Sequence, residues 1–486
     1  GGVVHCQDAH TGKSIYEKRL EPGADTVWAS PLLADGRLYV VSQHKGAYVV
    51  TASPEYKLLA HNVFEDDDSR TNASPAVSDG QLLLRSDKYL YCVGELPPPP
   101  ADAPALRRIA LAADEAGLED GHFDASARQR LGALIAGLTD AGLRRDTERL
   151  LPAFEWAAVQ RARDRLLLAE IKRLGGKATV EVQAPEWLRS VVGDEALSVF
   201  GRVVEIELNE RTDGHKEPVP KPLSERVTDD WLKRLAGQDR LRRLELSGTA
   251  VTSAGLVHLE GLKDLERLNL CLTAVDDRGF VYLAGLTKMR RMVVCSSKVT
   301  GTGFRHLTGM KQLESINLHS SPADDAGLEA IGRLTSLRRL EVVHTRVTDA
   351  GLKHLAGLVR LEQLHVHGPE TTAKALPFLG RLKELYQLDV YDRAASNETL
   401  EQAGRLPKLR LLTLVNGSFD DEGVKHLAGA AALEELSLDS PGVTDASIES
   451  LAGLHNLRTL RLGRARITPA GLRRLQALLP RATVVP

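Results

Sequence analysis

The chain has 486 residues, of which 43% are hydrophobic and 26% charged, and its formal net charge is −2. This near-neutral balance excludes a partner selected by net charge, and the composition is typical of a soluble protein of several domains. No apolar run approaches the roughly twenty residues that cross a bilayer. The aromatic content of 4% is low, as expected where Leu and Val fill a repetitive core.

Residues 1–95 contain short alternating strands separated by Gly, Asp-Gly and Ser-Pro turns. Residues 29–40 and 73–84 are copies, about forty-four residues apart, a period that suits propeller blades. Together with Cys-Gln-Asp-Ala-His-Thr-Gly at residues 6–12, these segments resemble the pyrroloquinoline-quinone-type β-propeller repeat. A propeller needs roughly four to eight blades to close. We therefore expect an incomplete propeller, and a chain that is the C-terminal part of a longer protein.

A Pro-rich segment at residues 96–104 predicts a stiff linker of polyproline type. Residues 105–175 carry helical spacing, for example at Leu131, Leu134, Ile135 and Leu138, and predict two or three helices. The basic residues between 161 and 173 alternate with Asp164 and Glu170, which favours a solvated helix face over a nucleic-acid site.

Residues 176–240 are interpreted as an N-terminal cap and an atypical first repeat. Val203, Ile206 and Leu208 have the spacing of a strand, and residues 227–235 that of a helix. The insertion between them, with Lys and Pro at residues 216–222, favours an extended surface loop. Residues 178–182 and 187–192 are expected to cover the open end of the solenoid.

Residues 241–486 contain ten consecutive units of twenty-four residues, without insertion or deletion. They begin at Leu241, Leu265, Met289, Leu313, Leu337, Leu361, Leu385, Leu409, Leu433 and Leu457. Within a unit the apolar spacing changes from two, typical of a strand, to three, which predicts a helix. One unit cannot bury its own apolar face, so the units must stack into a curved solenoid, with a parallel sheet on one side and helices on the other. Residues 482–485 predict a final partial strand.

Four aspartates fall just before the helical stretches, where a carboxylate accepts hydrogen bonds from unpaired backbone N–H groups. We predict that they are helix N-caps. They are Asp277, Asp325, Asp349 and Asp445.

The repeat Leu-x-x-Leu-x-Leu, followed by Gly-Leu-x-x-Leu-x-Gly-Leu, resembles the leucine-rich repeat family and its twenty-four-residue GALA-type branch over about residues 200–486. The resemblance implies a horseshoe that binds a macromolecule. At the ninth position, where the family usually has Asn, the first five units have Thr or Ser, whose hydroxyl can satisfy a turn amide. The later units have Pro369, Arg393, Gly417, Pro441 and Ala465, which predicts looser geometry from Leu361 onward. The predicted fold class is thus a partial all-β propeller, a short helical segment and an α/β leucine-rich repeat solenoid.

Strand residues alternate between core and solvent, so the concave surface follows from position in the repeat. The candidate binding residues on that surface are Arg243, Arg267, Arg291, Arg339, Glu341, His365, His367, Asp389 and Tyr391. They suit a polar protein partner, or a polysaccharide, with some acidic groups. Nucleic acid is disfavoured because Glu245 and Glu341 interrupt the basic row. The histidines are interpreted as recognition residues rather than metal ligands or acid–base groups.

The four cysteines have no metal-ligand spacing. Cys271 and Cys295 occupy one position of adjacent units and are close enough to meet, and we interpret them as stacked free thiols, with a disulfide as the alternative.

The sequence contains no phosphate-binding loop, nucleophile elbow, zinc-protease or dinucleotide motif. We therefore expect a noncatalytic scaffold that binds a protein partner and needs no metal or cofactor. The alternative is that the chain is the recognition region of a larger enzyme, either a quinone-dependent oxidoreductase or a signalling kinase. A resemblance of the propeller to outer-membrane-assembly lipoproteins favours a periplasmic or cell-envelope location.

Overall fold

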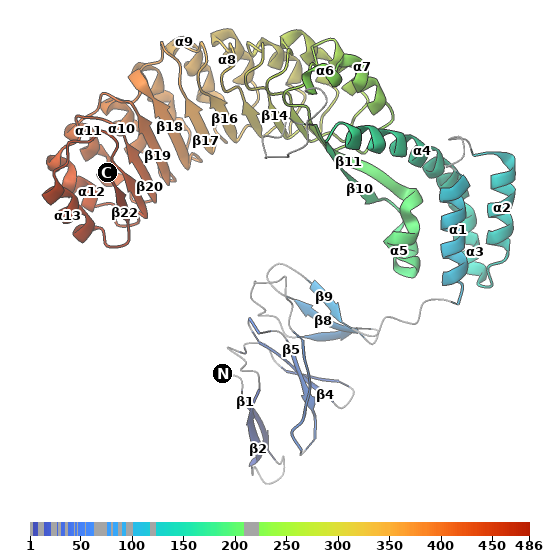
Figure 1. Ribbon diagram of the computed structural model, residues 1–486. Helices are drawn as coiled ribbons and strands as arrows, with labels where there is room; N and C mark the ends of the chain where they lie inside the picture. Colours follow the sequence, from blue (N-terminus) through green and yellow to red (C-terminus); the bar gives the residue numbers. More distant parts are fainter. Residues whose placement is uncertain are drawn as a thin grey trace. The chain divides into compact units, whose positions relative to one another are not determined.

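The chain forms two compact units, residues 1–101 and residues 102–486 (Figure 1). The computed structural model describes residues 101–116, 123–208 and 223–486, together with separate short segments between residues 3 and 93. The first unit contributes small antiparallel sheets and the second a helical segment joined to a long solenoid. Among the described residues, no helix combines the length and the apolar character that a membrane span requires.

The described part of the first unit contains three antiparallel sheets. The strands are β1 (Val3–Gln7) and β2 (Ser14–Arg19); β3 (Leu32–Ala34), β4 (Arg37–Val41), β5 (Ala47–Thr51) and β6 (Leu58–Asn62); and β7 (Ala76–Ser78), β8 (Gln81–Arg85) and β9 (Leu90–Val93). The two sequence copies fold alike, because hairpin β3–β4 in the first copy corresponds residue for residue to hairpin β7–β8 in the second. These sheets confirm a repeated β structure but do not by themselves show a propeller.

Four helices occupy the segment where the sequence predicts two or three. They are α1 (Ala103–Ala116), α2 (Ala125–Ala136), α3 (Ala141–Arg149) and α4 (Leu151–Arg173). Asp124 and Asp140 cap α2 and α3 by accepting backbone N–H bonds. Residues 94–100, which include most of the predicted linker, lie outside the described residues, and α1 already begins at Ala103.

A thirteen-stranded sheet runs through the second unit in sequence order. Strand β10 (Lys177–Val182) is antiparallel to β11 (Gly201–Glu207), and every later strand is parallel to its predecessor. These later strands are β12 (Arg243–Glu245), β13 (Arg267–Asn269), β14 (Arg291–Val293), β15 (Ser315–Asn317), β16 (Arg339–Val342), β17 (Gln363–Val366), β18 (Gln387–Tyr391), β19 (Leu411–Val415), β20 (Glu435–Leu438), β21 (Thr459–Arg461) and β22 (Thr483–Val485). The predicted final strand at residues 482–485 is confirmed by β22, whereas the insertion at residues 216–222 lies outside the described residues.

The strands line the inner side of the arc and the helices its outer side (Figure 1). The α-helices are α5 (Glu186–Val192), α6 (Leu223–Arg226), α7 (Asp229–Leu232), α8 (Asp325–Ile331), α9 (Asp349–Leu352), α10 (Asn397–Gly404), α11 (Asp421–Lys425), α12 (Ile448–Ala452) and α13 (Pro469–Leu478). The 3₁₀ helices are Asp194–Phe200, Lys233–Leu235, Gly255–Leu259, Asp277–Leu283, Thr302–Leu307, Lys353–Gly357, Ala373–Arg381, Asp392–Ala394, His426–Gly429 and Asp445–Ser447. Many predicted helices are therefore 3₁₀, which agrees with the spacing of three between Leu256 and Leu259, because a 3₁₀ helix has three residues per turn.

The core of the solenoid is a continuous stack of equivalent apolar side chains. Leu244 aligns with Leu268 on the next strand, and Leu268 with Met292, and all three are almost completely buried. At about 25 cal/mol per Å² of apolar surface, this burial between units is what makes stacking favourable.

The prediction that Asp277, Asp325, Asp349 and Asp445 are N-caps of their own helices is wrong. The cap is the preceding residue, for example Thr348, whose hydroxyl accepts from the N–H of Ala350. The aspartate instead bonds the next unit: Asp325 accepts from the backbone N–H of Thr348 at 2.8 Å and from its hydroxyl at 2.7 Å. The same pair recurs along the solenoid as Asp229–Thr252, Asp277–Thr300, Asp349–Thr372, Asp421–Thr444 and Asp445–Thr468.

This bond between units also explains the glycine of the Asp-Ala-Gly-Leu motif. A Cβ on Gly351 would collide with the carboxylate and backbone of Asp325, and one on Gly471 with Asp445. The motif therefore describes the contact between two units rather than a helix start within one.

The ninth-position hydroxyl donates to a carbonyl in the first units, and in Ser297 it also accepts from the turn N–H of Val299 at 3.3 Å, as the sequence suggests. Thr249 and Thr273 each donate to the carbonyl three residues earlier, at 2.7 Å. The residue just before this position has a left-handed backbone in most units, including His344 at φ 55° and Asp392 at φ 54°.

The looser geometry predicted from Leu361 onward is confined to two units. Asp392, Asn416 and Arg464 keep the left-handed turn, with φ between 54° and 56°. Gly368 and Ser440 depart from it because Pro369 and Pro441 follow, and a proline restricts the residue before it to extended conformations.

The cap of the solenoid differs in part from the prediction. Residues 178–182 extend the sheet as β10, but residues 187–192 in α5 pack into a second core with α1 rather than over the solenoid. The open end is covered by α4, whose Leu167, Ile171 and Leu174 join the solenoid core.

Polar contacts complete this attachment of α4. The predicted solvated face is confirmed for Arg163, Arg165, Lys172 and Arg173, which are exposed, whereas Asp164 among them is buried. Asp164 is fully buried and accepts from Gln238 at 2.5 Å, while Arg202 stacks on Trp156 and bonds Asp239 at 3.1 Å. Burial raises the pKa of Asp164, although the bond from Gln238 opposes the shift.

The interpretation of Cys271 and Cys295 as free thiols is wrong, because the two form a disulfide. In-register stacking brings their Cα atoms to 4.6 Å, within the range that a disulfide spans.

We predict that Asp325→Ala lowers the free energy of unfolding by about 1 to 3 kcal/mol, because two donors of Thr348 lose their acceptor. Chemical denaturation measures the effect. Glu329→Ala is the matched control, since it removes an exposed carboxylate whose pair with Arg333 contributes little. Equal midpoints for the two variants would show that the bond between units does not stabilise the solenoid.

We predict that the double variant Cys271→Ser, Cys295→Ser loses about 3 kcal/mol of stability, the entropic value for a loop of this length. Denaturation with and without reductant measures it. The wild type should fall to the stability of the variant when reduced, while the variant itself stays unchanged. A wild type insensitive to reductant would contradict the disulfide.

Candidate binding surface on the concave sheet

The concave surface is built from two outward-facing positions of each strand. Because the strands are parallel and in register, equivalent side chains form rows that cross the sheet. One row contains Arg243, Arg267, Arg291 and Arg339, and the other Glu341, His365 and Asp389. All seven are sequence-predicted binding residues. Arg339 is exposed on β16 and is separated from the other arginines by Ser315, and the remaining six form two groups.

The first group is the arginine row, which we define as Arg243, Arg267 and Arg291 on β12 to β14. These side chains, with Glu245, Asn269 and Val293 among their neighbours, surround a depression of about 330 Å³. Arg243 is paired with Glu207 at 3.2 Å and with Glu245 at 3.1 Å. Arg267 and Arg291 are exposed and have no ion-pair partner among the described residues.

The second group centres on His365, whose Nδ1 lies 2.7 Å from a carboxylate oxygen of Asp389. Asp389 also accepts from Gln387 at 3.2 Å, and its other oxygen is buried without a hydrogen-bond partner. Burial opposes protonation of the imidazole, but the bond to Asp389 and the charges of Asp389 and Glu341 outweigh it and raise the pKa of His365. Burial and the same two carboxylates raise the pKa of Tyr391.

The remaining predicted residue, His367, lies at the edge of the sheet in a histidine row, defined as His319, His344 and His367. Adjacent rings meet edge to face, with centroids 5.2 and 4.6 Å apart. His367 Nδ1 accepts from the backbone N–H of His344, so its Nε2 donates to Asp392 at 2.6 Å. Burial and the neighbouring imidazoles lower the pKa of His344.

Sequence reasoning missed His344 and Asp392. Both occupy the left-handed turn after the strand, outside the alternating strand pattern that identified the other candidates. Both residues occupy the same position of the repeat, in the turn that follows the strand. Including this position among the candidates would have identified them from the sequence.

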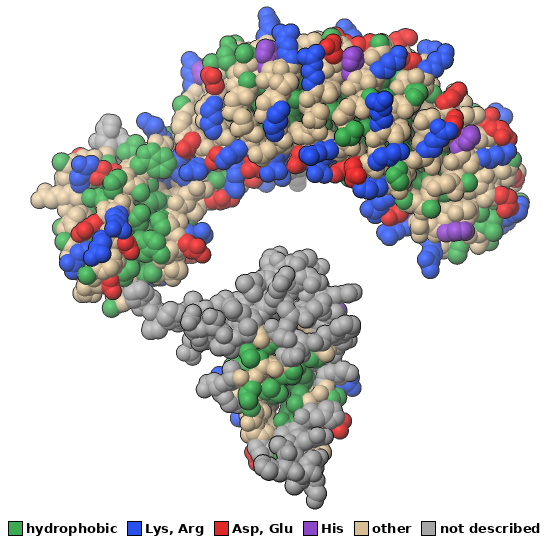
Figure 2. Space-filling view, turned by 180° about the vertical axis from the view of Figure 1, so that it is seen from behind, with side chains coloured by type: hydrophobic (Ala, Val, Ile, Leu, Met, Phe, Trp, Pro, Cys, Tyr) green, Lys and Arg blue, Asp and Glu red, His purple; other side chains and the backbone are tan. Residues whose placement is uncertain are grey.

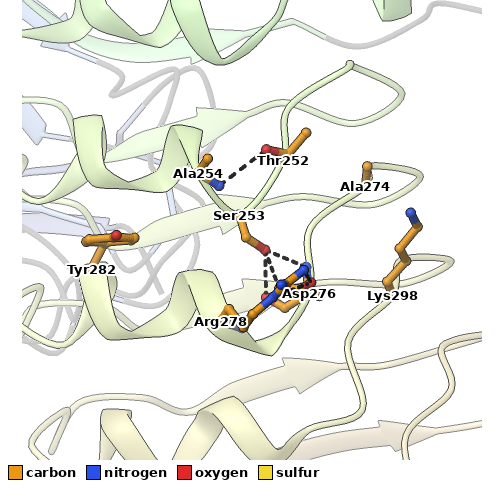
Figure 3. Close-up of a pocket in the computed structure, with 8 residues that line it drawn as sticks. All are labelled: Thr252, Ser253, Ala254, Ala274, Asp276, Arg278, Tyr282 and Lys298. Atoms are coloured by element: carbon orange, nitrogen blue, oxygen red, sulfur yellow. Dashed lines mark hydrogen bonds and ion pairs between the residues drawn. The ribbon is translucent and has the colours of Figure 1, made fainter.

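A larger depression, of about 530 Å³, lies outside the concave sheet at the start of the helical layer (Figure 3). Asp276 lies between Ser253, which donates at 2.6 Å, and Arg278, which donates at 2.6 and 3.0 Å. The Arg278 bond lowers the pKa of Asp276 to about 2. Ser253, Asp276 and Arg278 therefore bind one another, and the opposite charges of Asp276 and Arg278 are neutralised within the depression.

No group of three His, Cys, Asp or Glu side chains within the described part of the chain is arranged to hold a metal ion. What the concave surface offers is charged and hydrogen-bonding groups fixed on a rigid sheet.

Residues 333–356 match the model of the family described as Leucine Rich repeat. This unit is a leucine-rich repeat. Since the strands on both sides of it stack in register with the same twenty-four-residue spacing, the solenoid part of the second compact unit has a leucine-rich repeat fold.

The comparison with curated proteins finds no match. Among solved structures, the chain is similar to internalin InlF of Listeria monocytogenes, with 18% identity and a TM-score of 0.38 over 66% of this chain and 94% of that chain. Internalin C2 of the same organism has 24% identity and a TM-score of 0.34 over 43% of this chain and 83% of that chain. A TLR13–ssRNA13 complex matches with 17% identity and a TM-score of 0.36 over 52% of this chain and 40% of that chain.

We predict that Asp389→Asn lowers the pKa of His365, because the variant lacks the carboxylate that stabilises the imidazolium. Because the folded state binds the His365 proton more tightly than the unfolded state, protonation stabilises the fold. This contribution is fully present when the pH is below the unfolded-state pKa of about 6.5, and it is lost as the pH rises through the folded-state pKa. An NMR titration of the His365 ring measures the shift. Glu435→Gln on β20 is the control and should leave the titration unchanged. An unaltered midpoint in Asp389→Asn would contradict the assignment.

Proposed function

We propose that the leucine-rich repeat solenoid is a noncatalytic interaction module whose concave face binds a segment of another protein. The observation that carries this proposal is the set of rows of charged side chains fixed in register on the concave sheet. In these rows Arg267, Arg291 and Arg339 are exposed and form no ion pair with a described residue. Rigid presentation of such groups lowers the entropy lost on binding.

The outer face gives less support for a binding role, because many of its charges are already paired within a helix. Arg333 pairs with Glu329 and Lys425 with Glu422, in each case on neighbouring turns. Side chains engaged in such pairs are less available to a partner.

A protein partner fits the concave surface better than nucleic acid or a uniformly charged polysaccharide. Glu245 and Glu341 lie in the rows beside the arginines, so a continuous polyanion that crosses the sheet would meet carboxylates. A protein segment, by contrast, presents both signs of charge and apolar groups.

We predict that bulky substitutions on the concave face, Val293→Trp, Thr413→Trp and Ser437→Trp, abolish capture of the partner by steric exclusion. Lys353→Trp and Arg381→Trp on the outer layer are the matched controls. Affinity capture from cells of the source organism, with mass spectrometry of the bound proteins, measures the effect. Proteins lost with all three concave variants and retained by both controls support the proposal, whereas equal capture by the two sets would refute it.

We also infer that residues 1–95 form part of a β-propeller. The support is the equivalence of hairpins β3–β4 and β7–β8 and the four-stranded antiparallel order of β3 to β6, which is the strand count of one blade.

A further inference from the structure

Two neighbouring rows of side chains on the same edge of the sheet differ in their pattern of charge: one alternates in sign, and the other contains like charges. Just before strands β12 to β17, successive units alternate in sign, and the opposite charges pair: Arg290 lies 3.4 Å from Glu314 and 3.7 Å from Glu266. Tyr386 interrupts this alternation before β18. Further pairs of this row are Arg338–Glu362 and Arg410–Glu434, and Arg242 at its start pairs with Glu181 of β10. Blue and red side chains accordingly alternate along the concave rim in Figure 2. We call this set the neutral rim.

One residue further along, the same strands place like charges side by side. Arg243, Arg267 and Arg291 are in register on strands that lie about 4.8 Å apart. Like charges directly opposite each other on neighbouring strands destabilise a sheet. Of these three, only Arg243 has acidic partners among the described residues, and neither Arg267 nor Arg291 forms an ion pair with any of them.

The surroundings of the pair suit an anionic group. Arg267 and Arg291 flank the 330 Å³ depression on the concave face. The carbonyl oxygen of the Asn269 side chain accepts from the N–H of Cys271, which fixes the amide beside the two guanidinium groups. A guanidinium binds a carboxylate through two parallel hydrogen bonds, and such charge-assisted bonds are stronger than neutral ones.

The disulfide holds the two strands that carry this pair. Cys271 and Cys295 follow β13 and β14 by two residues, and their bond links the units of Arg267 and Arg291. The two guanidinium groups repel each other, but the disulfide prevents the strands that carry them from moving apart. The two groups are therefore held together before an anion binds, which lowers the entropy lost on binding.

We propose that Arg267 and Arg291 anchor an acidic segment of a partner protein by binding its Asp or Glu carboxylates in this depression. The proposal rests on the concave face being the binding surface. A protein segment is favoured over a polyanion because Glu245 and Val293 line the same depression, and they suit spaced carboxylates with apolar residues between them.

The test is fluorescence anisotropy of the full chain with a fluorescein-labelled peptide of six glutamates. A peptide of six glutamines, a heparin hexasaccharide and a single-stranded DNA oligonucleotide are the comparison probes. We expect the glutamate peptide to bind, binding to weaken as NaCl concentration rises, and Arg267→Ser with Arg291→Ser to weaken it by at least about tenfold.

The matched control is Arg290→Ser with Arg338→Ser, which removes the same charge from the neutral rim and should change the affinity by less than about twofold. Equal losses in both double variants, or no binding by the wild type, would overturn the proposal. Tighter, arginine-dependent binding of heparin or DNA would overturn the choice of an acidic protein segment.

The same variants separate this proposal from the function on which it rests. If the tryptophan substitutions on the concave face abolish capture of the partner while Arg267→Ser with Arg291→Ser does not, the concave face is the binding surface, but the two arginines do not anchor an acidic segment. If neither set affects capture, the concave surface itself is excluded.

Discussion

An aspartate in one unit accepts hydrogen bonds from the N–H and the hydroxyl of a threonine in the next, and this contact recurs from Asp229–Thr252 to Asp445–Thr468. The bond connects equivalent points of adjacent units, so it forms only when the two units are stacked in register. It also requires close approach, which is why a glycine such as Gly351 follows at the position that the neighbouring carboxylate touches. The leucine core makes stacking favourable, but a leucine core alone tolerates sliding, and the directional bonds fix the register.

Register has a direct consequence for the concave surface. When every strand is aligned with the next, a residue type that recurs in the repeat becomes a row in space. Alternating signs give the neutral rim, whereas recurring arginine gives the arginine row. Two adjacent positions of one repeat therefore differ: the charges at the first pair with one another, whereas Arg267 and Arg291 at the second form no ion pair with a described residue.

The disulfide between Cys271 and Cys295 belongs to this same arrangement. Identical positions in adjacent units are brought close by stacking, so two cysteines twenty-four residues apart become neighbours. The sequence pattern is the same whether the two cysteines are free thiols or form a disulfide, because in both cases they occupy equivalent positions of adjacent units. Only the structure shows that the two sulfur atoms are bonded.

The sequence by itself determined the solenoid, its units, the final strand and the rows of the concave face, because a periodic apolar pattern leaves one way to bury the leucines. It also located Arg243, Arg267 and Arg291, since strand alternation fixes which side chains face outward. Only the tertiary structure showed that Asp325 bonds Thr348 of the next unit and that α4 closes the solenoid. It alone paired His365 with Asp389 and His367 with Asp392. The reason is physical: periodicity encodes which face of each unit is buried, whereas contacts between units depend on the distance and angle at which the faces meet, and a single repeat does not contain that information.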